Sequence, residues 1–491
     1  MPAEPVPLRQ SNLSRLPARV RVPTYPRFRD AQDILHIGVG GFHRAHQAVY
    51  LDDLLHLEPG WRLVGVGILP QDARMRDVLR EQDFLYTDVE RDASGDSARI
   101  IGSIEEFCLG PEDREQVLER LAAENTKIIS LTITEGGYFV NQGTGAFDAT
   151  NSDIQYDLSH PSEPKTTFGY LAEALDRRRK AGRGPCTLMS CDNLQSNGEV
   201  LREMLLSFCE LRDPGLRSWL EQNGTFPNCM VDRITPATTE AHRKLLAEEF
   251  GIVDGWPVMP ETFRQWVIED HFVQGRPAWE KVGAQITGEV LPYEKMKLRL
   301  LNASHQAICY VGLLLGYESA DQAMADPQIP VLMRRMMDEE VTPILPPVPG
   351  IDLTAYKAAL VERFANLAVK DQLVRIATEG SARIPKFVLP SILDELEVNG
   401  PIRLLSFTVA SWIQFLRGVD DSGKPLTIIE PLADLVRPKA ALEDPTALIQ
   451  VNSLFGDILP RTERFTGLIN EFSRVFRTRG AREALTLALE R

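Results

Sequence analysis

In the first half of the chain, continuous apolar runs alternate with segments whose apolar residues recur at helical spacing. Four segments have the continuous apolar character of strands buried in a sheet, at 33–37, 61–68, 127–133 and 185–190. Apolar-periodic helices follow two of them, over 47–56 and from after residue 193 to about 211. This order predicts an α/β domain.

From about residue 288 the pattern changes to helices with prolines at their junctions. We therefore expect an α/β domain over 1–287 and a mainly α-helical domain over 288–491. Residues 1 to about 30 should lie as an arm over the first domain, and the polar stretch 141–167 should be an insertion or loop excursion. The helices expected in the second domain are 293–315, 330–340, 352–364, 392–397, 403–417, 444–455, 464–478 and 482–489.

Charge and composition exclude several classes of protein. The chain has 69 acidic and 54 basic residues, and its net charge of -15 would repel a nucleic acid. No apolar run has the length of a signal peptide core or a membrane span, so we expect a cytoplasmic protein with no membrane partner. The six cysteines form no paired CxxC motifs and the histidines no ligand spacing, which favours free thiols and no metal site.

A glycine turn directly follows the first strand and precedes a helix. Strand, glycine turn and helix is the order that a dinucleotide site needs, because glycines let the backbone approach a pyrophosphate. His43 occupies the place of the third glycine of the usual fingerprint, and a plain tight turn is the alternative. The residues expected to contact the cofactor here are Ile37, Gly38, Val39, Gly40, Gly41 and Phe42.

Polar residues also stand where the other strands end. Asp72 follows the second strand, where an acid holds a ribose diol and repels a 2′-phosphate, so it favours NAD. Arg74 acts in the opposite direction, so NADP stays open, and a solvated loop carboxylate is an equally ordinary interpretation. Glu135 and Asn193 end the strands near 127–133 and 185–190, at the edge where ligands of open α/β sheets bind. Asn193 could instead cap the next helix.

The segment 293–316 carries polar groups on an apolar helix. At about 100° per residue, Lys297, His305 and Asn302 fall at roughly 0°, 80° and 140° and share a broad face. A base, an imidazole and a carboxamide together could do chemistry. The alternative is a helix with an exposed lysine, a satisfied histidine and a polar bend. Similarly, Asp232 and Arg233 could simply pair at the surface.

Several long motifs occur in one order along nearly the whole chain: FHRAHQAVY, TITEGGY, MSCDN, MVDRITP, QWVIED and KLRLLNASH. Together they resemble the polyol-specific long-chain dehydrogenases, the mannitol dehydrogenase family. The resemblance implies an extended Rossmann-type domain followed by a mostly helical substrate domain. It also implies a zinc-independent enzyme that is monomeric.

The resemblance assigns roles to individual residues. Lys297 is the expected general acid/base, and Asn193 and Asn302 are the expected oxyanion hole. Arg383 stands where some relatives have lysine, and Gln71–Asp72 stands where some have an acidic pair. The other implied residues are His305, Arg375 and Arg383 for the substrate, Glu294 for proton transfer, Asp232 in the active site, and Asp72 and Glu135 for the cofactor, with Glu135 in the cleft.

The implied reaction is NAD-dependent oxidation of a polyol secondary alcohol, D-mannitol to D-fructose, and its reverse. D-arabinitol, sorbitol or a hexuronate are alternative substrates, and a catalytically inactive nucleotide-binding regulator is an alternative class. Lys297 can act as a base only if burial and nearby cations lower its pKa from the ordinary value of about 10.4. Glu294 could be a helix N-terminal acid, and Arg375 and Arg383 could form structural ion pairs.

Overall fold

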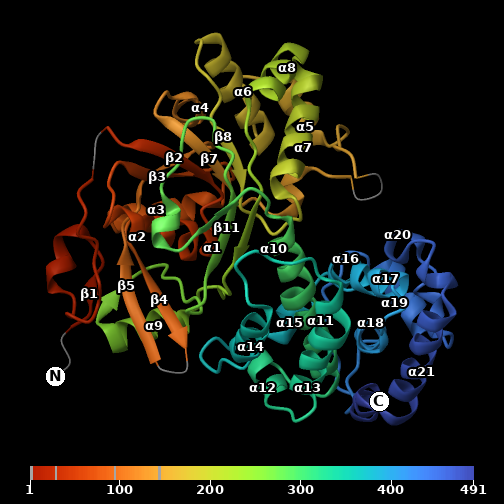
Figure 1. Ribbon diagram of the computed structural model, residues 1–491. Helices are drawn as coiled ribbons and strands as arrows, with labels where there is room; N and C mark the ends of the chain where they lie inside the picture. The colour runs from red at the N-terminus through yellow and green to blue at the C-terminus, as the bar shows by residue number, and fades with distance from the viewer. Residues whose placement is uncertain (1–3, 28–29, 93–94, 142–144, 491) are drawn as a thin grey trace. The chain divides into compact units, whose positions relative to one another are not determined.

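The computed structural model describes residues 4–27, 30–92, 95–141 and 145–490 (Figure 1). The chain forms two compact units, Met1–Leu291 and Pro292–Arg491. The sequence pattern put this division after residue 287. Each unit is described on its own below.

The N-terminal unit is built on a parallel five-stranded sheet, which confirms the predicted α/β fold. Alternate residues of its central strand enter different cores: Leu35 and Ile37 face one side of the sheet, and Ile34 the other. The edge strand β6 was not predicted, because Glu105 and Glu106 interrupt its apolar pattern. In spatial order the strands are β6 (Ile104–Leu109), β3 (Trp61–Gly67), β2 (Gln32–Ile37), β7 (Thr126–Leu131) and β8 (Thr187–Ser190).

Helices cover both faces of this sheet. One core lies under α4, α6, α7 and α8, and the other lies under α2 and α3. This is the doubly wound arrangement that a Rossmann-type domain requires. The helices are α1 (Gly41–Ala45), α2 (Gln47–Leu55), α3 (Asp72–Glu81), α4 (Arg114–Ala122), α5 (Ser152–Ser159), α6 (Thr167–Lys180), α7 (Asn197–Arg212), α8 (Pro214–Asn223) and α9 (Glu240–Phe250).

The expected loop excursion over 141–167 is in part helical, which corrects the sequence interpretation. Helix α5 begins because the Asn151 side chain accepts hydrogen bonds from the amides of Asp153 and Ile154. Ile154 is fully buried against the sheet core. The polar composition hid a short helix that depends on one cap and two buried side chains, those of Ile154 and Asp157.

Smaller β elements complete this unit. The strands β9 (Cys229–Asp232), β11 (Gln265–Glu269) and β12 (Gln285–Thr287) form a three-stranded sheet, and β4 (Tyr86–Asp92) and β5 (Gly95–Ile101) form a hairpin. In Figure 1 the hairpin extends away from the parallel sheet, with α9 nearby.

The described residues of the N-terminal segment, 4–27, pack on the first unit. Strand β1 (Val6–Pro7) pairs in parallel with β10 (Ile252–Val253). Leu8 and Val20 are buried in a core with Phe250 of α9. The arm is therefore part of the fold of this unit.

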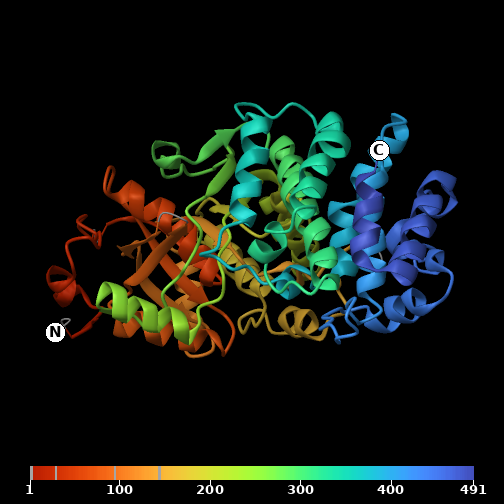
Figure 2. The same ribbon diagram turned by 90° about the horizontal axis from the view of Figure 1, so that it is seen from below.

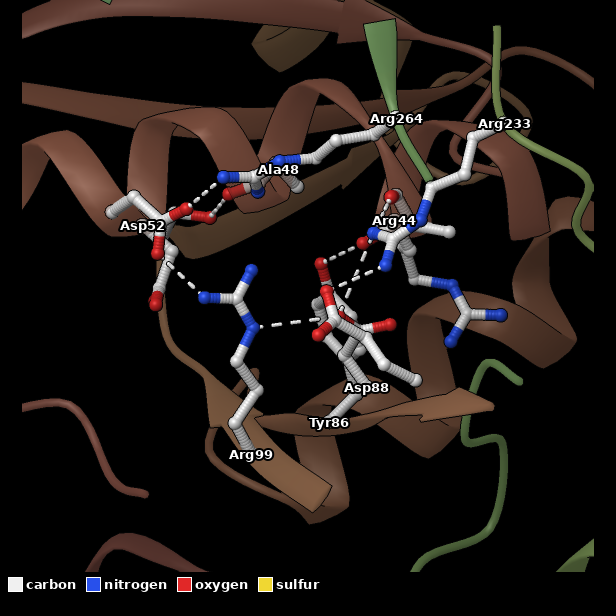
Figure 3. Close-up of polar contacts among 12 residues, drawn as sticks. Arg44, Ala48, Asp52, Tyr86, Asp88, Arg99, Arg233 and Arg264 are labelled. Carbon is white, nitrogen blue, oxygen red and sulfur yellow. Dashed lines mark hydrogen bonds and ion pairs between the residues drawn. The ribbon is translucent and has the colours of Figure 1, made fainter. Parts of the chain in front are cut away.

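A buried network of ion pairs joins the β4–β5 hairpin to β9. Figure 3 shows Arg99 and Arg233 directed at Asp88, with nitrogen–oxygen distances of 3.4 and 3.7 Å. Arg233 also donates to Glu90 at 2.7 Å and to the carbonyl of Ala45 at 2.5 Å. The expected surface position of Asp232–Arg233 is wrong, because both residues are buried.

In the described part of the C-terminal unit the regular elements are helices (Figure 2). Helix α11 is buried along almost its whole length and packs against α18. The main helices are α10 (Leu291–Met296, which begins at the boundary), α11 (Ala303–Leu314), α12 (Ala320–Met324), α13 (Ile329–Arg335), α14 (Leu353–Phe364), α15 (Leu373–Ile376), α16 (Gly380–Phe387), α17 (Leu389–Glu397), α18 (Arg403–Phe415), α19 (Ala433–Ala441), α20 (Asn452–Phe455), α21 (Glu463–Arg479) and α22 (Ala481–Leu489).

Several details of this unit differ from the sequence expectation, among them the helices α12, α15, α16 and α19, which were not predicted. The segment 444–455 is not one helix but a 3-10 turn, Pro445–Ala447, followed by the short α20. Two segments form π-helices, Lys297–Asn302 and Met336–Val341. Such i→i+5 turns occur frequently at functional sites, and sequence periodicity does not reveal them.

Glu340 of the second π-helix makes the stability of this unit depend on pH. Its carboxylate is 1% exposed and accepts the amides of Leu404 and Leu405 at the start of α18, at 2.7 and 2.8 Å. Burial raises the pKa of Glu340 from 4.5 to about 7. Between these values the folded state binds more protons than the unfolded state, so stability falls as pH rises, by about 1.4 kcal/mol per pH unit.

We therefore expect Glu340→Gln, which stays neutral, to gain stability relative to the wild-type protein as pH rises from 5 to about 7. Above that window the difference should be constant. Urea unfolding at several pH values measures it, with Glu397→Gln, an exposed carboxylate at the end of α17, as the control. A difference that does not change with pH would refute the assignment.

Candidate active site

The glycine turn after β2 leaves its backbone open. Gly38 has φ +93°, and a Cβ there would lie 2.1 Å from the carbonyl oxygen of Thr132, so only glycine fits. A Cβ on Gly40 or Gly41 would meet its nearest atom at 3.8 or 3.9 Å. The protein itself does not need glycine at these two positions, which leaves room for a ligand to approach the chain. This arrangement fits a dinucleotide pyrophosphate.

Where the usual fingerprint has its third glycine, this chain has His43, whose side chain packs against β2. Its ring stacks on that of His36 in β2, with centroids 3.5 Å apart and an interplanar angle of 8°. The His36 ring nitrogens bond the hydroxyls of Ser130 and Thr132, both at 2.8 Å, and Thr132 donates to the carbonyl of Gly38. Burial lowers the pKa of His36 to about 3, so a neutral imidazole fastens the turn.

The turn makes a prediction that separates folding from cofactor binding. Gly40→Ala should leave Tm nearly unchanged, because the position is extended (φ -104°, ψ -170°) and has room for a Cβ. It should raise the Kd for NAD by about tenfold or more, since the methyl group occupies the approach to the backbone. Thermal unfolding and cofactor titration measure both quantities.

Gly38→Ala is the matched comparison. It should lower stability by about 1–3 kcal/mol, because alanine is strained at this φ and meets the Thr132 carbonyl. Equal NAD affinity in Gly40→Ala and the wild-type protein would contradict the assignment of the turn.

Asp72 is the first residue of α3, and one oxygen of its carboxylate is hydrogen-bonded to the backbone. Oδ2 accepts the amides of Ile68 and Leu69 at 3.0 and 2.9 Å, and within the described chain Oδ1 has no hydrogen-bond partner. The Arg74 guanidinium lies over the Trp256 ring, 4.9 Å from its centroid. An oriented carboxylate with one open oxygen suits a ribose diol, and the stacked arginine is engaged elsewhere.

The other predicted residues of this unit lie at strand ends. Glu135 is exposed in a 3-10 helix, Glu135–Tyr138, after β7, and Asn193 is exposed in the turn after β8. The N-cap of α7 is Ser196, so the alternative role of Asn193 as that cap is wrong. Asp232 is the last residue of β9 and is 5% exposed.

In the C-terminal unit the polar segment is buried. Glu294, Lys297 and Asn302 are only 4%, 8% and 7% exposed, which excludes the alternative of a solvent-exposed lysine. The angles calculated for an α-helix are wrong here, because Lys297–Asn302 is a π-helix. Lys297 and Asn302 are the first and last residues of that π-helix. A lysine buried at this position can be held in a fixed orientation, which suits a group that transfers a proton.

His305 is the third residue of α11 and keeps an open ring nitrogen. Its ring stacks on Phe364 at 4.1 Å with an interplanar angle of 21°, and its buried Nε2 has no hydrogen-bond partner in the described chain. Burial lowers its pKa well below the usual value, and the charges of Arg375, Arg363, Arg383 and Lys297 lower it further. His305 is therefore a neutral imidazole that can bind a hydroxyl group.

The two predicted substrate arginines are held differently. Arg375 forms a bidentate ion pair with Asp371, at 2.7 and 2.5 Å, yet its side chain is 57% exposed. Arg383 donates to the carbonyl of Ile376 at 2.8 Å and to Thr378 at 3.2 Å. The structural ion pair weighed for Arg375 exists, and its exposed donors can also reach a ligand. Sequence reasoning missed Asp371, although its i−4 spacing from Arg375 was a signal.

Other site classes receive no support from the described residues. No group of three or more His, Cys, Asp or Glu side chains there could hold a metal ion. No helix in those ranges has the length and apolar character to cross a bilayer. All six cysteines are free and buried.

Comparison with known families decides the classification. Residues 32–281 match the mannitol dehydrogenase Rossmann domain, and residues 289–474 match the mannitol dehydrogenase C-terminal domain. The chain belongs to the mannitol dehydrogenase family. This confirms the resemblance carried by the motifs from FHRAHQAVY to KLRLLNASH.

Relatives and solved structures extend over the whole chain. A protein of Aspergillus fumigatus named mannitol 2-dehydrogenase is 46% identical over 96% of this chain and 97% of its own length. The mannitol 2-dehydrogenase of Pseudomonas fluorescens, solved as a ternary complex with NAD and D-mannitol, is 44% identical with a TM-score of 0.91 and covers 99% of both chains. A D-sorbitol dehydrogenase, solved in substrate-free form, is 36% identical with a TM-score of 0.91, covering 98% of this chain and 100% of its own.

Proposed function

We propose the following reaction for this NAD-dependent polyol dehydrogenase: oxidation of D-mannitol at C2 to D-fructose, and its reverse. The observation that carries the proposal is a buried lysine followed by an amide and a neutral imidazole within nine residues, Lys297 to His305. The relatives named mannitol 2-dehydrogenase, and the solved complex with NAD and D-mannitol, support this choice of substrate.

The residues that would hold NAD lie in the N-terminal unit. The open backbone of Gly40 and Gly41 receives the pyrophosphate, between Ile37 and Phe42, and the free oxygen of Asp72 receives the ribose diol. Bound NAD supplies the acceptor for the hydride that leaves the alcohol carbon. Because Arg74 stacks on Trp256, NAD is preferred over NADP.

Lys297 is the general base in this proposal. Its amine takes the proton from the hydroxyl group as the hydride leaves carbon, and in the reverse direction it returns that proton to the carbonyl oxygen. Asn193 and Asn302 donate side-chain N–H groups to the same oxygen, so negative charge on it is stabilised by neutral donors. The lysine thus promotes removal of the proton and the amides stabilise the charge on the oxygen. These are the two tasks of zinc in other alcohol dehydrogenases, so the reaction is zinc-independent.

The remaining residues bind the substrate and move the proton. Nε2 of neutral His305 bonds a hydroxyl next to the reacting carbon. Arg375, oriented by Asp371, and Arg383 bind the more distant hydroxyls. Glu294, three residues before Lys297, passes the proton towards water, and Asp232 and Glu135 complete the polar lining.

D-sorbitol is the second candidate substrate, favoured by the 36% identity to a D-sorbitol dehydrogenase. It differs from D-mannitol only in the configuration at one carbon, so the same groups apply. A hexuronate is less suited, because Asp371 already neutralises Arg375. A regulator without catalysis would not need Lys297, Asn193 and Asn302 together.

The test is a panel of D-mannitol, D-sorbitol, D-arabinitol and a hexonate with NAD+ or NADP+, following absorbance of the reduced nicotinamide. We expect the highest kcat/KM with D-mannitol and NAD+, D-fructose as product, and full activity in a strong chelator. No turnover of any polyol would refute the dehydrogenase. Activity lost in chelator and restored by zinc would refute the metal-free mechanism.

A further inference from the structure

Asp192 links two strand ends of the N-terminal unit, although it is not among the predicted site residues. Its carboxylate is 8% exposed and accepts three hydrogen bonds. Oδ1 accepts the amide of Thr134 at 2.9 Å, and Oδ2 accepts the amide of Ile133 at 3.0 Å and the hydroxyl of Tyr138 at 2.6 Å. All three donors belong to the segment after β7.

That segment holds a backbone conformation that costs energy. Thr134 has φ +60° and ψ 167°, a region occupied almost only by glycine, and its β-branched side chain makes the position still less favourable. Thr134 is exposed, so its side-chain packing does not account for the conformation. The amides of Ile133 and Thr134 both donate to the Asp192 carboxylate, and these bonds hold the turn in this shape together with the bond from the Gly137 amide to the carbonyl of Thr134.

The backbone of Asp192 is fixed equally firmly. Its carbonyl accepts from Asn197, at 3.1 Å, and Asn197 is fully buried and also bonds the backbone of Cys229 in β9. Asn193 is the next residue along the chain. The strained turn that carries Glu135 and the turn that carries Asn193 therefore share one rigid anchor.

We propose that Asp192 is a positioning residue for the reaction: its carboxylate holds the strained Thr134 turn against the Asn193 turn, so that Glu135 and Asn193 keep a fixed relative position. The inference rests on the proposed function, in which Asn193 stabilises the alkoxide. A buried carboxylate is needed because it can accept from two consecutive amides and a hydroxyl at once. Burial raises the pKa of Asp192 above the usual range, a cost that this role explains.

Asp192→Asn tests the role with little change in shape. One side of the carboxamide becomes an N–H donor, so at least one of the amides of Ile133 and Thr134 loses its acceptor. In the cofactor-free protein, hydrogen exchange at these two amides should become faster by tenfold or more. For the polyol, kcat should fall by about 10–100-fold with a smaller change in KM, since misplacement of about 1 Å has effects of this size.

Asp157→Asn is the matched control. Asp157 is 1% exposed and also accepts two backbone amides and one hydroxyl, from Lys165 and Thr166, at 2.7 to 2.9 Å. It lies in the α5 segment and holds no strained residue of the site. Its variant should keep the wild-type kcat and the wild-type exchange rates at Ile133 and Thr134.

Two further variants keep the proposal testable if Asp192→Asn folds poorly. Tyr138→Phe removes one of the three donors and should give a smaller loss of kcat. Thr134→Gly removes the strain, so in the Asp192→Asn background it should restore part of the lost kcat, which a general loss of stability would not allow.

The outcomes separate the two claims. Wild-type exchange rates at Ile133 and Thr134 in Asp192→Asn, or a kcat equal to that of Asp157→Asn, would overturn the positioning role while the proposed function stands. Failure of Thr134→Gly to restore any activity would overturn the part assigned to strain. Absence of polyol turnover in the wild-type protein would overturn the proposed function, and the exchange rates would still report whether Asp192 anchors the turn.

Discussion

Lys297→Ala should lower kcat for D-mannitol by about 10²–10⁴-fold, the range expected when a general base is removed. The affinity for NAD should stay close to the wild-type value, because no cofactor contact is assigned to this side chain. Steady-state kinetics and cofactor titration measure the two effects. The loss should not be repaired by raising the substrate concentration, since the variant lacks a group that acts during the chemical step.

Lys295→Ala is the control for this variant, because Lys295 is two residues away and partly exposed. It should retain wild-type kcat. A Lys297→Ala variant with unchanged kcat would show that another group accepts the proton. A variant that fails to bind NAD would show that Lys297 supports the fold rather than the chemistry.

Asn193→Ala and Asn302→Ala should each lower kcat by about 10²–10³-fold, equal to roughly 3 kcal/mol in the barrier. In the proposed mechanism each variant removes a neutral donor to the reacting oxygen, which carries more charge in the transition state than in the alcohol. KM should change less than kcat, because the ground-state hydroxyl gains less from these donors. The double variant should lose less than the product of the two single losses, since the donors act on one atom.

Asn223→Ala provides the comparison, because Asn223 is exposed and its side chain donates to the carbonyl of Trp219 in its own helix. Unchanged kcat in either the Asn193 or the Asn302 variant would remove that residue from the oxyanion hole. An effect confined to KM would indicate a role in ground-state binding instead.

The parallel sheet could be predicted from sequence because most of its strands can be recognised from the residues of that strand alone. Strands buried on both faces give continuous apolar runs, as in β2 and β7, and the glycine turn follows β2 directly. The hairpin β4–β5 and the sheet of β9, β11 and β12 were missed. In the hairpin, charged pairs such as Arg99–Asp88 replace the apolar signal, and in the three-stranded sheet β9 pairs with β11 from a distant part of the sequence.

The residues of the candidate site likewise divide into those that the sequence revealed and those that it did not. Motif resemblance pointed to Lys297, Asn302 and His305, but the α-helical phase assumed for them is wrong, because Lys297–Asn302 is a π-helix, which sequence periodicity does not reveal. Asp192 and Phe364 were missed because the residues around them in sequence do not reveal their roles. Asp192 accepts hydrogen bonds from amides far away in the sequence, and Phe364 stacks on the distant His305. Such contacts appear only when the chain is folded.

Transfer of labelled hydrogen tests the central claim most directly. D-mannitol carrying deuterium at its equivalent carbons C2 and C5 is incubated with the wild-type protein, NAD+ and a strong chelator, and the masses of the reduced cofactor and the ketose are measured. Direct hydride transfer predicts that the reduced nicotinamide carries one deuterium and that D-fructose keeps the other. Reduced nicotinamide without deuterium, or no reduced nicotinamide at all, would contradict the account.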